Sequence, residues 1–130
     1  MIRGTTAQFR FHIPYKFDEI NWVTIKFWQK GNTGTTESPL PITKRKTDCY
    51  TSSNPNEICV SLNPEETSRF SDQLKAYVQL RAQTEDGITF ASNQELITVY
   101  PINNEMIAED PDLPVPEPGD SVVLLDGSTI

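Results

Sequence analysis

Histidine and cysteine are scarce in this sequence of 130 residues, which contains one His and two Cys. A standard structural zinc site takes four Cys or His ligands, so these residues cannot form one unaided. Glycine-rich phosphate loops, GxSxG nucleophile elbows and HExxH pairs are absent as well. The single histidine, His12, has no Cys or Ser beside it to activate. We therefore expect a protein that is not an enzyme, with no catalytic residues, no cofactor and no metal.

Long apolar runs are also missing, and none approaches the roughly 20 residues of a membrane helix. The first six residues, 1–6, lack the apolar core of a secretory signal. The net charge of −7, from 11 Lys and Arg against 18 Asp and Glu, disfavours binding to nucleic acid or to anionic membranes. We expect a protein that is made in a cytoplasm and leaves it, if at all, by assembly or lysis.

Lysine and arginine are absent from residues 101–130, which hold seven of the acidic residues and five of the ten prolines. Residues 1–100 hold all 11 basic residues and the other 11 acidic ones, so their charges cancel. This shift predicts a neutral domain over residues 1–100 and an acidic, proline-rich arm over residues 101–130. The prolines favour an extended, polyproline-like spacer in the arm.

An apolar, β-prone stretch follows this spacer, and the last residue is apolar too. A strand of this kind can bind by completing a sheet edge or groove on a partner or on a neighbouring copy. We therefore expect the partner-binding residues to be Val122, Val123, Leu124, Leu125 and Ile130. The alternative is an incidental apolar run in a disordered tail.

Apolar and polar residues alternate along most of residues 1–100, as in half-buried β-strands. The expected strands cover residues 7–13, 22–29, 42–46, 57–62, 74–84, 89–91 and 96–100. The prolines before the third strand suit a sheet edge, and Asp86-Gly87 predicts a hairpin. Asn63 as N-cap and Pro64 at the first helical position predict one short helix that ends near Phe70.

Six or seven strands in 100 residues, with turns about every 8–12, favour an all-β fold: an antiparallel sandwich of the immunoglobulin or fibronectin-III type. A small barrel is the alternative. The fold class expected here is thus a β-sandwich with one short helix and an extended C-terminal tail.

Two pairs of residues leave more than one interpretation open. Cys49 and Cys59 flank a loop and are either a disulfide or two reduced thiols. Trp22 and Trp28 belong either to a sugar-binding platform or to a core or assembly contact.

The basic cluster 44–46 is too small for a nucleic-acid surface and suits an acidic segment, such as the arm of a neighbouring copy. The carboxylate pairs 18–19, 65–66 and 109–110 are adjacent in sequence, and adjacent strand residues point to opposite faces, so we do not expect acid/base dyads.

The N-terminal residues MIRGTT, followed by the FxFxIP pattern of residues 9–14, resemble small uncharacterised virion-associated proteins of tailed bacteriophages and prophages of gut bacteria. The later order of a strand, an acidic short helix, the strand with Val78 to Arg81 and a glycine hairpin is similar as well. The sequence departs from this pattern at Ala7, where proline is expected, and in the acidic arm. The resemblance implies a virion component, in capsid or tail, without a catalytic motif.

These observations favour a non-enzymatic structural component of a phage particle, attached through its C-terminal arm to other virion proteins or to copies of itself. The protein would then be found in the virion. The alternative is a carbohydrate- or surface-binding β-module that uses Trp22 or Trp28. A weaker third possibility is an acidic inhibitor that mimics DNA, which would need its acids on a rigid surface.

Overall fold

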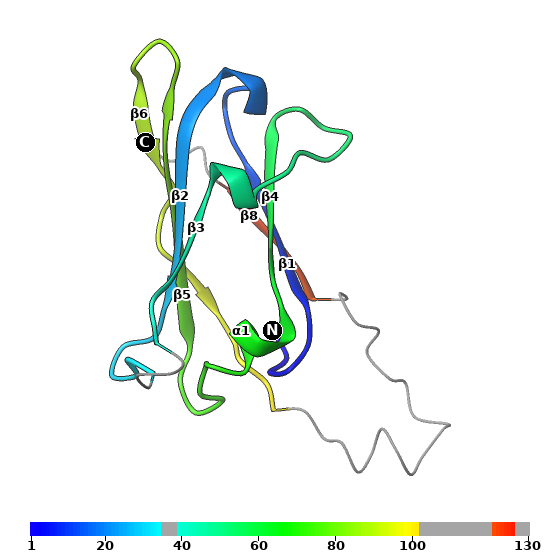
Figure 1. Cartoon of the computed structure of the whole chain (residues 1–130), viewed down its shortest axis with the longest axis vertical. Helices are drawn as coiled ribbons and strands as arrows, with labels where there is room; N and C mark the ends of the chain where they lie inside the picture. The colour runs from blue at the N-terminus through cyan, green and yellow to red at the C-terminus, as the bar shows by residue number, and fades with distance from the viewer. Residues whose placement is uncertain (35–38, 102–120, 127–130) are drawn as a thin grey trace.

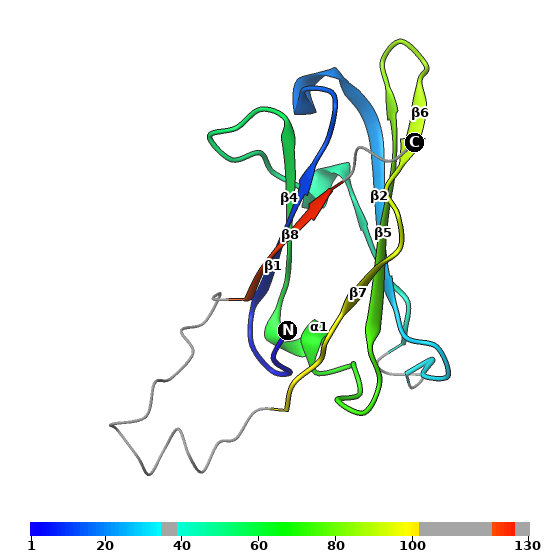
Figure 2. The same cartoon turned by 180° about the vertical axis from the view of Figure 1, so that it is seen from behind.

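The computed structural model describes residues 1–34, 39–101 and 121–126, and these residues form two β-sheets (Figures 1 and 2). The three-stranded sheet has the order β4–β1–β8, with bounds Glu57–Leu62, Ala7–His12 and Ser121–Asp126. The five-stranded sheet has the order β3–β2–β5–β6, with bounds Ile42–Arg45, Ile20–Trp28, Ala76–Thr84 and Thr89–Ala91. Strand β7 (Glu95–Ile97) also pairs with β5. These pairings confirm the all-β expectation.

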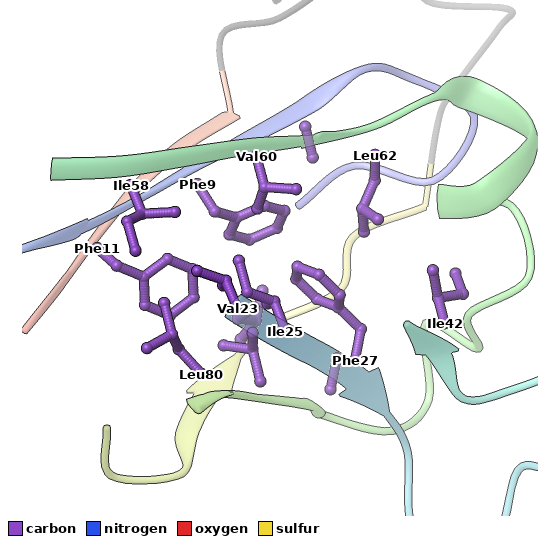
Figure 3. Close-up of a cluster of buried hydrophobic side chains, with 14 of the residues drawn as sticks. Phe9, Phe11, Val23, Ile25, Phe27, Ile42, Ile58, Val60, Leu62 and Leu80 are labelled. Atoms are coloured by element: carbon purple, nitrogen blue, oxygen red, sulfur yellow. The ribbon is translucent and has the colours of Figure 1, made fainter. Parts of the chain in front are cut away.

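The hydrophobic core lies between the two sheets and is built from the buried positions of the alternating strands (Figure 3). The first sheet contributes the fully buried side chains Phe9, Phe11, Ile58, Val60 and Leu62. The second contributes Val23, Ile25, Phe27, Val78 and Leu80. The rings of Phe9 and Phe27 meet across the core, with centroids 5.0 Å apart and planes tilted by 54°. Because apolar and polar residues alternate with a period of two in the sequence, the inward faces of these strands were predicted correctly.

The expected short helix is present but ends earlier than predicted. Helix α1 covers Pro64–Thr67, and its first turn is a capping box. The Asn63 side chain accepts a hydrogen bond from the Glu66 backbone N–H at 2.8 Å, and the Glu66 carboxylate accepts one from the Asn63 N–H at 3.0 Å. Beyond Thr67 the chain tightens into i to i−3 bonds, such as Phe70 N–H to the Thr67 carbonyl, and the Phe70 ring turns into the core.

The last expected strand of residues 1–100, the body of the protein, is also shorter than predicted, because two partners share the segment. Strand β7 ends at Ile97, whereas residues 98–100 pair with the start of the chain. The Tyr100 N–H donates to the Met1 carbonyl at 2.8 Å, and the Arg3 N–H donates to the Tyr100 carbonyl at 2.9 Å. The predicted hairpin is confirmed between β5 and β6, where Gly87 adopts the left-handed φ of 91° that favours glycine.

Two short 3₁₀ helices, η1 (Phe17–Glu19) and η2 (Lys46–Asp48), were not predicted. Each is one turn long and joins a strand to the next segment of chain. Neither has an apolar periodicity that sequence reasoning could detect. Helix η2 shortens the third expected strand, so that β3 ends at Arg45.

Candidate functional site

The C-terminal strand β8 lies against the free side of β1, in the sheet that β1 forms with β4 (Figures 1 and 2). Six residue pairs are in register, from Ala7 opposite Ser121 to His12 opposite Asp126. The strands run parallel, whereas β1 and β4 run antiparallel. Strand β1 is therefore enclosed on both sides, on one side by a segment that lies more than 100 residues further along the chain.

Four of the five expected partner-binding residues, Val122 to Leu125, lie in this strand and are paired in register with Gln8 to Phe11. The fifth, Ile130, lies outside the described residues, as does the acidic and proline-rich part of the arm, residues 102–120. The structure thus places the predicted docking strand on a sheet edge of its own chain.

A second candidate surface is the outer face of the five-stranded sheet. Alternation along β2 places Trp22, Thr24, Lys26 and Trp28 on this face, opposite the buried positions. Their cross-strand neighbours on β5 are Gln83, Arg81, Gln79 and Tyr77, in that order. Strand β3 adds Arg45 beside Thr24, and Thr43 beside Lys26.

This face carries an open groove of about 680 Å³. Its floor comes from the outward residues of β2, β3 and β5, and residues 32–33 and 40–41 form part of its wall. The lining includes three cations, Lys26, Arg45 and Arg81, and contains no Asp or Glu among the described residues. The described ion pairs involve none of these three cations. The described lining of the groove is therefore electropositive, although the protein as a whole is acidic.

The two tryptophans have different surroundings, and only Trp28 lines the groove. Trp28 stacks on Tyr77 with ring centroids 5.6 Å apart and planes 16° apart, and Lys30 Nζ lies 5.2 Å from the Tyr77 centroid. Trp22 donates a hydrogen bond from its indole N–H to Gln83 at 3.0 Å. Both tryptophans are partly buried on the outer face, so they do not belong to the core between the sheets.

The basic cluster of residues 44–46 does not form one surface patch. The Lys44 ammonium reaches a Glu66 carboxylate oxygen at 2.7 Å, Arg45 lines the groove, and Lys46 donates to the Ile20 carbonyl. Alternation along β3 separates Lys44 from Arg45. Sequence reasoning grouped three neighbouring cations, whereas the groove joins Arg45 to Lys26 and Arg81, which are far apart in sequence. Lys26, Arg45 and Arg81 are polar positions of three expected strands. Which of these strands pair, and in which register, could not be read from the sequence.

His12 and the acidic pairs show no catalytic arrangement in the part of the chain that the structure describes. His12 is partly exposed, and its Nδ1 lies 3.8 Å from the nearly buried Glu57 carboxylate, which accepts a hydrogen bond from the Ser52 hydroxyl at 2.8 Å. Glu65 pairs with Arg69, whereas Glu66 caps the helix and binds Lys44. No three His, Cys, Asp or Glu side chains gather as metal ligands among these residues. None of their helices is long and apolar enough to cross a bilayer.

Cys49 and Cys59 are free thiols, which matches the reduced alternative. Residue Tyr50, next to Cys49, pairs with Cys59 through two backbone hydrogen bonds of 2.8 and 2.9 Å. Burial raises the pKa of Cys49 to about 12, helped by the neighbouring Asp48 and Cys59 and opposed by Lys44. Burial also raises the pKa of Cys59. Neither thiol is activated as a nucleophile.

The sequence matches no protein-family model and no curated protein. The two candidate surfaces, the β1 edge and the outer groove, therefore have to be interpreted from their own geometry and charge.

Proposed function

We propose that this protein is a non-enzymatic structural subunit of a bacteriophage particle, associated with the capsid head or serving as a tail or baseplate adaptor, and attached through its C-terminal arm. The observation that carries the proposal is the parallel pairing of β8 with the whole length of β1. Adding a strand to a sheet edge satisfies backbone hydrogen bonds and is a common way for proteins to join.

The strand order supports placing the fold in the immunoglobulin or fibronectin-III class. In that class strand B lies between A and E, while C pairs with C′ and F, and F with G. Here β1 and β4 match B and E, and β3–β2–β5 match C′–C–F, with β6 and β7 at the G position. Strand β8 occupies the position of A but runs parallel to β1. In this interpretation, the fold is completed by the far end of a chain.

The connection to β8 is long enough to reach a second molecule. Residues 102–120 separate Pro101 from Ser121, and an extended proline-rich chain of that length spans about 60 Å. The same strand can therefore fill the β1 edge of its own body or that of a neighbour. In a crowded particle, the high local concentration of neighbours favours exchange between copies.

The assignment to a phage particle rests on the N-terminal MIRGTT and FxFxIP pattern and on the likeness to virion-associated proteins that this pattern implies. Other virion proteins or further copies of the same chain are the partners in this proposal. Mass spectrometry and electron microscopy of purified virions test it directly, because the chain must be found in the particle.

The attachment step is tested with a matched pair of proline substitutions. Val123→Pro removes a backbone donor within β8, whereas Val115→Pro adds a proline to a spacer that is already rich in it. We expect Val123→Pro, like deletion of residues 101–130, to leave the body folded by circular dichroism but to prevent incorporation into the assembly. Val115→Pro should assemble normally. Normal assembly of the deletion variant would refute the attachment role of the arm.

A carbohydrate- or surface-binding module is the second candidate, favoured by the position of Trp28 in the groove. Aromatic rings beside amide and hydroxyl groups are suited to sugars. This function requires that an isolated monomer binds a glycan, which a glycan array or titration calorimetry measures. The structural function instead requires oligomers or co-purification with virion proteins.

A further inference from the structure

We propose that the outer groove of one copy binds the acidic, proline-rich segment of residues 109–118 from a second copy. The inference rests on the proposed function, because it assumes that arms connect neighbouring copies. It assigns the groove to one occupant, a carboxylate-bearing proline-rich peptide, and gives the spacer a binding role of its own.

Three cations lie close together in the described lining of the groove. Arg45 on β3 and Arg81 on β5 both pair with Thr24, one on each side of β2. Their Cα atoms are therefore two strand spacings, or about 10 Å, apart. Lys26 follows two residues further along β2, about 7 Å from Thr24. The three cations are exposed and have no carboxylate partner among the described residues. Their mutual repulsion is relieved by an anionic ligand.

The lining of the same groove also has an aromatic and apolar part. Trp28 lies in its lining, backed by the stacked ring of Tyr77, and Leu40 and Pro41 contribute from the segment before β3. Proline-rich peptides dock on aromatic-lined grooves, because their extended conformation costs little entropy on binding. A groove whose lining combines cations with a tryptophan suits a peptide that carries both acids and prolines.

The arm contains such a peptide. Residues 109–118 read EDPDLPVPEP, with four acids, four prolines and no basic residue. Glu109 and Asp112 are three residues apart, as are Pro111 and Pro114, and residues at that spacing share one edge of a polyproline helix. One edge can then face the cations while the other faces Trp28.

A second copy is the favoured source of the peptide because of where the groove lies. Strand β8 completes the three-stranded sheet, whereas the groove is on the outer face of the opposite sheet. A chain whose own β8 fills its own β1 edge would have to lead its spacer around the body and back. When β8 is exchanged, the spacer connects two bodies and lies where their surfaces meet.

The test uses a labelled peptide of residues 107–120 and the full-length protein with Glu109→Gln, Asp110→Asn, Asp112→Asn and Glu117→Gln, so that its own arm does not compete. Fluorescence anisotropy measures the dissociation constant. We expect binding that weakens with added salt, and an approximately tenfold loss when Lys26→Gln and Arg81→Gln are introduced together. The matched control, Lys16→Gln with Lys75→Gln, removes two exposed cations elsewhere and should leave the affinity unchanged.

Several outcomes would overturn the proposal. The first is no binding at millimolar peptide, and the second is an equal loss of peptide affinity in the groove and control variants. The third is undiminished binding of a peptide whose acids are replaced by amides. The fourth is displacement of the peptide by an oligouronate that binds more tightly. Strand exchange is read separately, from hetero-oligomers formed when two differently tagged full-length proteins are mixed. Exchange without peptide binding would refute the groove proposal alone. Peptide binding without exchange, and without incorporation into virions, would refute the proposed attachment instead.

Discussion

At the scale of single residues, the Glu66 side chain contacts both the start of helix α1 and strand β3. Its carboxylate caps the backbone of Asn63 and forms a pair with Lys44 at 2.7 Å. The side chains of Glu66 and Lys44 are only 12% and 16% exposed. This cluster ties helix α1 to the edge strand β3 and so fixes one end of the five-stranded sheet.

Replacement of Glu66 by Ala should therefore cost about 3 kcal/mol of unfolding free energy, because it removes the cap and leaves the Lys44 ammonium largely buried without its partner. The neighbouring Glu65, 63% exposed and paired with Arg69 on the helix surface, is the matched control. Glu65→Ala should cost no more than about 0.5 kcal/mol. Urea denaturation followed by tryptophan fluorescence measures both values, and equal losses would contradict the assigned role.

The two thiols give a prediction that depends on pH. The pKa of Cys49 in the folded state is about 12, so at pH 8 only about one thiol in ten thousand is ionised and reactive. Labelling by a disulfide reagent should therefore be slow in the native protein and become faster as the pH rises. In denaturant without reductant, two thiols per chain should react at once. Rapid native labelling at pH 8, or fewer than two thiols after unfolding, would contradict the structure.

The same shift has a defined effect on stability. The folded state holds the Cys49 proton more tightly than the unfolded chain, whose thiol ionises near its ordinary value of 9.0. The protonated Cys49 thiol therefore makes its full contribution to the free energy of unfolding below about pH 9. This contribution is lost as the pH rises toward 12.

At the scale of elements, strand β1 is the centre of its sheet only while β8 is present. Along β1, backbone N–H groups alternate in direction, so those of one parity bond to β4 and those of the other parity bond to β8. The amides of β1 are thus protected on one side by β4, within the body, and on the other side by β8, in the C-terminal arm.

Hydrogen exchange should show this alternation directly. In the full chain all amides within β1 should be protected, whereas a chain that stops after residue 120 should lose protection at every second residue of β1. Amides within β5, which pairs with other strands on both sides, serve as the internal control and should be unchanged. If every β1 amide stays protected in the shortened chain, β8 does not pair with β1 in solution.

At the scale of the whole molecule, the charge is divided between a neutral body and an acidic arm. All 11 basic residues lie in residues 1–100, and they are balanced there by 11 acidic ones. The sequence pI of about 4.6 is therefore a property of the arm. The arm keeps the protein away from charge neutrality at pH 7, which favours solubility.

Replacing the six acids of residues 105–120 by their amides should move the pH of lowest solubility from about 4.6 to between about 5 and 7. This variant takes the net charge from −7 to −1 and leaves β8 intact. Precipitation by polyethylene glycol across a pH series measures the shift. An unchanged minimum would mean that the arm does not control solubility.

Much of the fold could be predicted from the sequence because its signals are local. The period of two in residues 7–13 and 57–62 identified the buried faces, and Asn63-Pro64 and Asp86-Gly87 identified the helix start and the hairpin. The errors lie where a contact that is distant in the sequence redirects a segment, or where a one-turn helix such as η2 has no apolar periodicity of its own. Residues 98–100 leave β5 for the N-terminal residues, and the chain after Thr67 bends so that Phe70 enters the core.

Composition and periodicity are properties of neighbouring residues, so the inward face of each long strand, the split of charge between body and arm, and the apolar stretch at residues 122–125 could all be read from the amino-acid order. The pairing of the strands, in contrast, is established by the folded chain. Register joined Lys26, Arg45 and Arg81 into one groove and separated Lys44 from Arg45. It also placed β8 beside β1, a contact between segments more than 100 residues apart that no local pattern encodes.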